Sequence, residues 1–172
     1  MANAETITVR RMAFEFPADL DAVFISGQPE ESYSNIALSL LLPYLEPYLI
    51  RTMRAAKPRV SDPELAGALD KFVAQEGQHY RQHARFNAVF RERGFAGLAP
   101  LEAELAADYE RFTKTKSLRF NLAFAEGFEA FTTAMTLVAI EIDTSSWHRA
   151  VHDLFFWHLL EELRTTSRCR RR

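Results

Sequence analysis

The stretch FVAQEGQHYRQHARFN, residues 72–87, decides how this chain folds. Its large apolar residues recur at the three- and four-residue steps of an amphipathic helix, and Glu76, His79 and His83 stand on the same stripe. A carboxylate or imidazole on the apolar face of a helix is costly to bury unless it is paired or bound to a cation. The stretch therefore predicts a helix whose buried face carries a polar site.

Working outward, the rest of the chain has the same periodicity and no alternation typical of strands. The pattern predicts helices over residues 32–56, 63–93, 101–114, 117–142 and 144–163. The fold class is therefore expected to be all-α, a bundle of four to five helices.

Local signals refine these boundaries. Pro43 and Pro47 each remove a backbone donor, so the first helix is expected to kink or break near Glu46. Ser61 or Asp62 is expected to cap the second helix, and Gly94 to end it. The segment 117–142 is apolar on more than one side, so we expect it to be the central helix.

Composition limits the class of protein. The chain has 172 residues, 48% hydrophobic and 26% charged, which fits one soluble domain. The net charge is −2, and five Arg lie in the last nine residues, so the body is acidic and nucleic acid is not expected as a partner. The longest apolar run, 36–50, is too short for stable membrane insertion. Cys169 is the one cysteine, and no signal segment is visible, so a cytoplasmic location is expected.

Three parts are expected along the chain. Residues 1–31 form an irregular N-terminal arm, residues 32–163 form the helical metal-binding domain, and residues 164–172 form an aberrant basic tail.

Carboxylates and imidazoles recur on the apolar faces of several expected helices. The candidates are Glu46 on the first, Glu76, His79 and His83 on the second, Glu126 or Glu129 on the fourth, and His158, Glu161 and Glu162 on the last. Two divalent metal ions at the bundle centre would satisfy them together, because a Glu and a His three residues apart project to one side of a helix. Ferritin-like di-iron bundles use this ligand pattern. Iron is expected, with manganese and zinc as alternatives.

Other interpretations remain open at this point. A lone Glu-x-x-His pair is common in helices, and Glu76 is equally able to pair with Arg81 or Arg85. Repetition over several helices favours the metal. His83 fits a ligand, a partner of a ligand or a structural hydrogen-bonder. Periodicity does not separate Glu126 from Glu129.

The chain also resembles a known family. The segments RRMAFEFP, NIALSLLLPYLEPYLIRTMR, FVAQEGQHYRQHARFN, EAFTTAM and FFWHLLEEL are similar, in that order, to the predicted metal-dependent hydrolases of bacteria, over about residues 8–163. That family is regarded as ferritin-like. The resemblance implies a ligand set of Glu46, Glu76, His79, His83, Glu129 and Glu162, and it favours Glu129 over Glu126.

The resemblance fails at the end of the chain. Thr165 stands where a second Glu-x-x-His would place its imidazole, and Thr is a poor metal ligand. We therefore expect a truncated or frameshifted member whose last helix is incomplete. His158, four residues before Glu162, is expected to substitute for the missing imidazole. Uncovered apolar surface would favour homo-oligomers.

The expected function is hydrolysis by a di-metal centre, acting on a small molecule. An apolar or aromatic substrate is suggested by phenylalanines that would otherwise be plain core, namely Phe72, Phe86, Phe124, Phe128, Phe131 and Phe155. No nucleophilic Ser or Cys arrangement is visible, so metal-bound water would have to act. The alternatives are oxygen chemistry at a di-iron centre and a catalytically dead helical remnant.

Overall fold

The computed structural model describes residues 7–169, with side chains as far as residue 163. Its elements are α1 (Pro29–Ala56), the 3-10 turn η1 (Lys57–Arg59), α2 (Pro63–Glu92), α3 (Leu98–Thr115), α4 (Leu118–Ala139) and α5 (Arg149–Cys169). Over this range no strand forms, and one isolated bridge joins Ile25 to Trp147. The predicted all-α bundle is confirmed.

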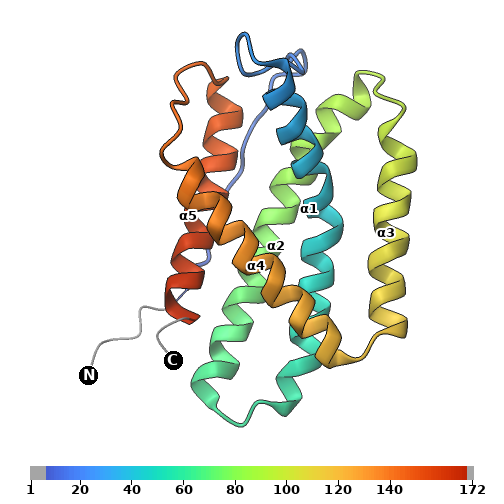
Figure 1. Ribbon diagram of the computed structural model, residues 1–172, viewed down its shortest axis with the longest axis vertical. Coiled ribbons are helices and arrows are strands. Elements are labelled where there is room, and N and C mark those ends of the chain that lie inside the picture. Colours follow the sequence, from blue (N-terminus) through green and yellow to red (C-terminus); the bar gives the residue numbers. More distant parts are fainter. Residues whose placement is uncertain (1–6, 170–172) are drawn as a thin grey trace.

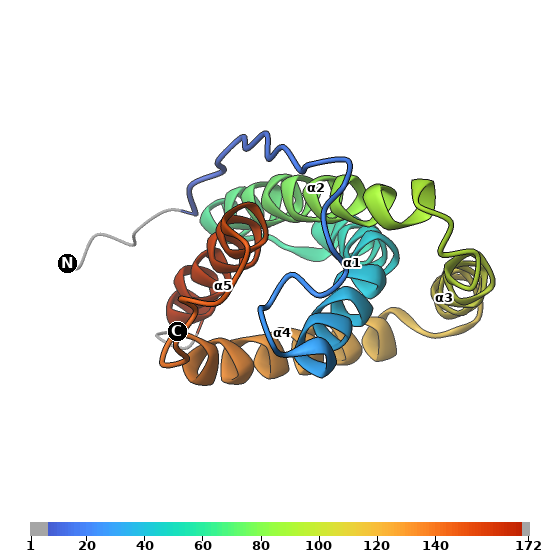
Figure 2. The same ribbon diagram turned by 90° about the horizontal axis from the view of Figure 1, so that it is seen from above.

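The helices surround α1. Figure 1 shows α1 and α2 side by side, with α3 at one edge, α5 at the other and α4 crossing in front. Seen from above, α4 lies across the bundle from α2, and α5 closes the end opposite α3 (Figure 2). Helix α1 packs against α2, α3 and α4. The central helix is therefore α1.

The expectation that the 117–142 segment is central is wrong. Helix α4 buries only small or polar residues, Asn121, Ala125, Thr133 and Thr136. Phe131 and Val138 are 56% and 66% exposed. By length and composition alone, α4 is the one helix of the described chain that could cross a membrane. Its apolarity on two sides reflects an uncovered face.

The boundaries of the first four expected helices are confirmed to within three residues, whereas α5 begins at Arg149, five residues later than expected, and continues past residue 163. Helix α1 begins at Pro29, where proline is well suited to the first turn, and continues unbroken through Pro43 and Pro47. Asp62 caps α2 by accepting a hydrogen bond from the Glu64 N–H at 2.9 Å. Gly94, with φ +87°, follows the end of α2.

Two apolar clusters stabilise the bundle. The first joins Leu20, Phe24 and Ile25 of the N-terminal arm to the second half of α2 and the start of α5. The second joins α1 to the start of α2, to α3 and to α4. Along α2, the first cluster includes Phe86 and the second Phe72, and the polar stripe of residues 76–83 lies between them.

The backbone of residues 164–169, in the segment expected to be a basic tail, belongs to α5. Helix α5 continues through Cys169. The side chains of residues 164–169, that of Thr165 included, and residues 170–172 are not described.

Candidate metal centre

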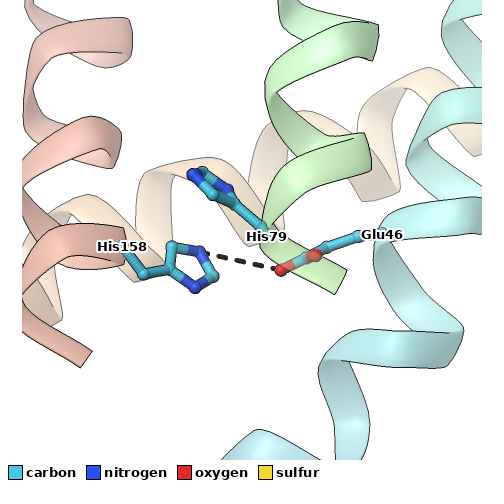
Figure 3. A group of neighbouring side chains, drawn as sticks. All are labelled: Glu46, His79 and His158. Carbon is cyan, nitrogen blue, oxygen red and sulfur yellow. Dashed lines mark ion pairs between the residues drawn. The ribbon is translucent and has the colours of Figure 1, made fainter. Parts of the chain in front are cut away.

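Four helices place acidic and imidazole side chains around one buried point. Glu46 comes from α1, Glu76 and His79 from α2, and Glu129 from α4; α5 supplies His158, Glu161 and Glu162. Figure 3 shows Glu46, His79 and His158 pointing toward one another from α1, α2 and α5. Glu46, Glu76, His79 and Glu162 are at most 3% exposed.

His79 lies among three carboxylates. Its Nδ1 is 3.6 Å from Glu76 Oε2 and 3.4 Å from Glu162 Oε1, and its Nε2 is 3.1 Å from Glu161 Oε2. The His158 ring stacks on it with centroids 4.0 Å apart. A cation bound to His79 would therefore lie within reach of carboxylates from both α2 and α5.

His158 approaches the same carboxylates from α5. Its Nε2 lies 3.3 Å from Glu162 Oε1 and 3.6 Å from Glu46 Oε1. Two overlapping groups result, Glu46–His79–His158 and Glu76–His79–Glu162, and within each the ligand atoms all lie within 4.8 Å of one another. Each of these groups could hold a metal ion.

Several buried polar atoms of the centre lack hydrogen-bond partners among the described residues, as expected of atoms that bind a cation. Among the described residues, no hydrogen bond reaches either carboxylate oxygen of Glu46, Oε1 of Glu76 or Nδ1 of His79. Buried carboxylates without partners cost several kcal/mol, roughly, unless a cation or a proton neutralises them. Oxygen and imidazole donors are those that divalent first-row metals accept.

The ionisation of the centre is strongly perturbed. Burial, reinforced by neighbouring carboxylates, raises the pKa of Glu46 well above its ordinary value. Burial also raises the pKa of Glu76, to about 7, although His79 opposes the shift. Burial alone would lower the pKa of His79, but Glu76, Glu161 and Glu162 raise it well above normal. At neutral pH the metal-free centre therefore holds protons at positions that a metal would occupy.

The pKa values of Glu161 and Glu162, the two carboxylates of α5 that lie against histidines, are lowered instead. Burial would raise the pKa of Glu162, but His158 and His79 hold it well below its usual range. The pKa of Glu161 is also lowered, because hydrogen bonds from His79 and Arg10 outweigh its burial. Arg10 Nη1 lies 2.9 Å from Glu161 Oε1, so this carboxylate already has a permanent cation. Of the two, Glu162 is the more available ligand.

The structure separates Glu129 from Glu126. Glu129 faces the centre and lies within hydrogen-bonding reach of Glu162; burial and the neighbouring carboxylates raise its pKa to about 11. Glu126 is exposed, and no described contact joins it to the centre. The geometry thus places at the centre the residue that the family resemblance favoured.

His83 lies one turn beyond His79 and is fully buried. Its Nδ1 lies 2.8 Å from Ser39 Oγ, and its Nε2 lies 2.9 Å from Nδ1 of His158. Ser39 Oγ in turn donates to Asn87 Oδ1 at 2.8 Å. Both ring nitrogens of His83 are thus engaged by protein groups, which distinguishes it from His79.

Sequence reasoning did not single out Ser39, Asn87 or Arg10. A signal existed for the first two, because Ser39 precedes Glu46 by two helical turns and Asn87 follows His83 by one. Arg10 belongs to the irregular arm, where no periodicity indicates its partner. Ser39 beside His83 resembles a nucleophilic pair, but the buried hydroxyl donates to Asn87 and is closed to solvent.

A small cavity reaches the centre between α1, α4 and α5. Its volume is about 30 Å³, and its walls are largely apolar, formed by Leu38, Leu42, Met135, Phe155 and Leu159, with His83, His158, Glu162 and Thr132. Since one water molecule needs about 10–15 Å³, the cavity holds about two. Among the phenylalanines expected near a substrate, Phe155 lines this cavity. Phe72 and Phe86 belong to the apolar clusters, Phe124 and Phe128 pack against the second cluster, and Phe131 is exposed.

Comparison with known proteins supports a metal-dependent role. A model of one family, described as predicted metal-dependent hydrolase, matches residues 8–164. No curated protein and no solved structure matches the chain at a significant level. The family match covers the whole buried centre, from Arg10 of the arm to Glu162 of α5. The chain therefore belongs to the family of predicted metal-dependent hydrolases.

Proposed function

We propose that the chain binds two divalent metal ions in the buried Glu/His centre and hydrolyses a small apolar molecule there. One observation carries the proposal: two overlapping groups of buried ligand atoms share His79, and several of those atoms have no hydrogen-bond partner among the described residues. Divalent ions, when bound, supply Lewis acidity and an activated water at neutral pH. The family description supports hydrolysis as the type of reaction.

The assignment of ligands follows the two groups. Glu76, His79 and Glu162 would hold one ion, and Glu46 with His158 would hold the other. Glu162 faces both histidines and is suited to bridge the two positions. Carboxylates and Glu-x-x-His from several helices support a ferritin-like, di-metal arrangement with iron expected and manganese or zinc as alternatives.

The chain's own residues define how a substrate would meet the centre. The largely apolar walls of the cavity favour an apolar group. The cavity ends at His158 and Glu162, so a bound molecule would contact that side of the centre. Glu129, protonated at neutral pH in the metal-free centre because of burial, lies beside Glu162 and would join the ligands when a metal ion displaces its proton.

Oxygen chemistry at a di-iron centre is the second candidate. The observation that favours it is the largely apolar lining of the cavity beside His158 and Glu162, which suits a small apolar gas such as oxygen. A folded bundle that binds no metal would support a third reading, a catalytically dead remnant.

Metal content per chain tests the proposal first. The protein, expressed anaerobically with ferrous iron, is expected to hold close to two ions by elemental analysis. Glu76→Ala should lower this number, whereas Glu126→Gln, an exposed control on α4, should not. A folded helical protein that binds no metal would overturn the proposal. Ester hydrolysis by the zinc form and oxygen consumption by the ferrous form then separate the two candidates.

A further inference from the structure

A chain of buried hydrogen bonds runs from α1 through α2 to α5. It begins at Pro43, which has no N–H to donate to the Ser39 carbonyl four residues earlier. Asn87 Nδ2 from α2 donates to that carbonyl instead, at 2.9 Å. A carbonyl oxygen only accepts, so this contact fixes which end of the Asn87 amide is the donor.

The direction of the next bonds follows from the first. Because Nδ2 of Asn87 faces the Ser39 carbonyl, its Oδ1 accepts the hydroxyl hydrogen of Ser39 at 2.8 Å. A serine hydroxyl has one hydrogen, so Ser39 Oγ can only accept from His83 Nδ1, 2.8 Å away. His83 therefore carries its hydrogen on Nδ1.

The orientation then passes to α5. His83 is 0% exposed, and its described partners are the Ser39 hydroxyl, the His158 ring and Phe155, none of them a carboxylate, so the buried ring is neutral and its Nε2 is bare. The hydrogen in its 2.9 Å bond with His158 must come from Nδ1 of His158. Nε2 of His158 is then the nitrogen outside this chain of hydrogen bonds, and it faces Glu162 and Glu46.

We propose that Ser39 and Asn87, acting through His83, engage the Nδ1–H of His158 so that its Nε2 points at Glu46 and Glu162. His158 is thereby the nitrogen ligand of the second metal position, through Nε2, and His83 is a positioning residue rather than a ligand. The ligand role of His158 rests on the proposed metal function, whereas the engagement of its Nδ1 does not. A nitrogen aimed at carboxylates needs a cation between them, either a proton or a metal ion, and fixing Nδ1 presents Nε2 to that position.

Histidine tautomers can be read directly in the metal-free protein. Long-range proton–nitrogen spectra of the chain labelled at its five histidines distinguish protonated from bare ring nitrogens. His158 is expected to show a protonated Nδ1, and His83 a protonated Nδ1 with a bare Nε2. Added zinc should shift the Nε2 signal of His158 and leave His83 hydrogen-bonded. A bare Nδ1 on metal-free His158, or zinc bound to His83, would overturn the inference.

Matched serine variants test the origin of the orientation. Ser39→Ala removes the acceptor for His83, so both tautomers of His158 should appear, and zinc affinity at one of two positions should fall about 10–100-fold. Ser32→Ala is the control, since Ser32 is equally buried on α1 but bonds to Ile25 and Gln28. Ser39→Thr keeps the hydroxyl and should restore both properties, which separates positioning from a loss of folding. Unchanged tautomers in Ser39→Ala would overturn the role of Ser39.

The two proposals fail in different ways. Metal-free spectra with the expected tautomers but no zinc binding would overturn the metal centre and the ligand role of His158, and would support the positioning by Ser39 and Asn87. Two bound zinc ions with the opposite tautomer would overturn the positioning and support the metal centre.

Discussion

Replacing Glu76 by Gln removes one buried carboxylate from the centre and keeps its shape. Burial raises the pKa of Glu76 from 4.5 to about 7. At about 1.4 kcal/mol for each unit of pKa, the ionised carboxylate lowers the free energy of unfolding by about 3 kcal/mol at pH 8. The metal-free Glu76→Gln variant should therefore be more stable than the parent chain by up to that amount.

The difference in stability between Glu76→Gln and the parent chain depends on pH. A group whose pKa is raised in the folded state stabilises it at low pH and loses that contribution as pH rises through the folded pKa. The difference between variant and parent should be close to zero at about pH 4.5 and should grow until about pH 7. Urea unfolding with a chelator present, followed by circular dichroism over this range, measures it.

Bound metal should make the parent more stable than the variant. Zinc at about 1,000 times its dissociation constant stabilises the parent by about 4.1 kcal/mol, which exceeds the variant's advantage of about 3 kcal/mol, and the variant has lost a ligand. Glu161→Gln is the control on the same centre, because the pKa of Glu161 is lowered and its loss should destabilise the metal-free chain. A Glu76→Gln variant that is less stable than the parent at pH 8 without metal would refute the reasoning.

Three further expectations concern single measurements. Zinc affinity should increase from about pH 6 to about pH 8, because His79 and Glu76 are protonated in the metal-free centre and must release their protons when zinc binds. Calorimetry in buffers of different ionisation enthalpy detects the released protons, and an affinity that does not change with pH would contradict this expectation. Glu129→Gln should lower the number of bound metal ions, whereas Glu126→Gln should leave it unchanged; elemental analysis measures both. Equal losses in the two variants would contradict the orientation of α4 that places Glu129 at the centre and Glu126 in solvent. Val138→Glu, at a 66% exposed position, should change the free energy of unfolding by no more than about 0.5 kcal/mol and reduce any self-association seen by light scattering; a large loss of stability would place α4 inside the bundle.

The helices could be predicted because each has a local signal. Asp62 and Gly94 set the ends of α2, and apolar steps of three and four residues mark the buried faces. The position of α4 could not be predicted, because a helix that is apolar on two sides gives no indication of which side is covered. In the folded chain the side of α4 that carries Asn121 and Thr133 is buried, and Phe131 is exposed.

The site was predictable where residues stand on stripes. Glu46, Glu76 and His79 lie on buried faces of α1 and α2, so their meeting could be anticipated before the geometry was known. The link between Ser39 and Asn87 could not, because it depends on the register of one helix against another. Pro43 was interpreted only as a break in α1, whereas the carbonyl that it frees is satisfied by α2.

Trp157 gives the chain an optical property of its own. The indole lies beside His79, with ring centroids 5.0 Å apart and planes nearly perpendicular. The other tryptophan, Trp147, packs among Phe24, Phe155 and Phe156. An open-shell ion held by His79 would quench the emission of Trp157 on contact, while a closed-shell ion would leave it bright. The protein thus reports, by its own fluorescence and without a label, which kind of ion has entered it.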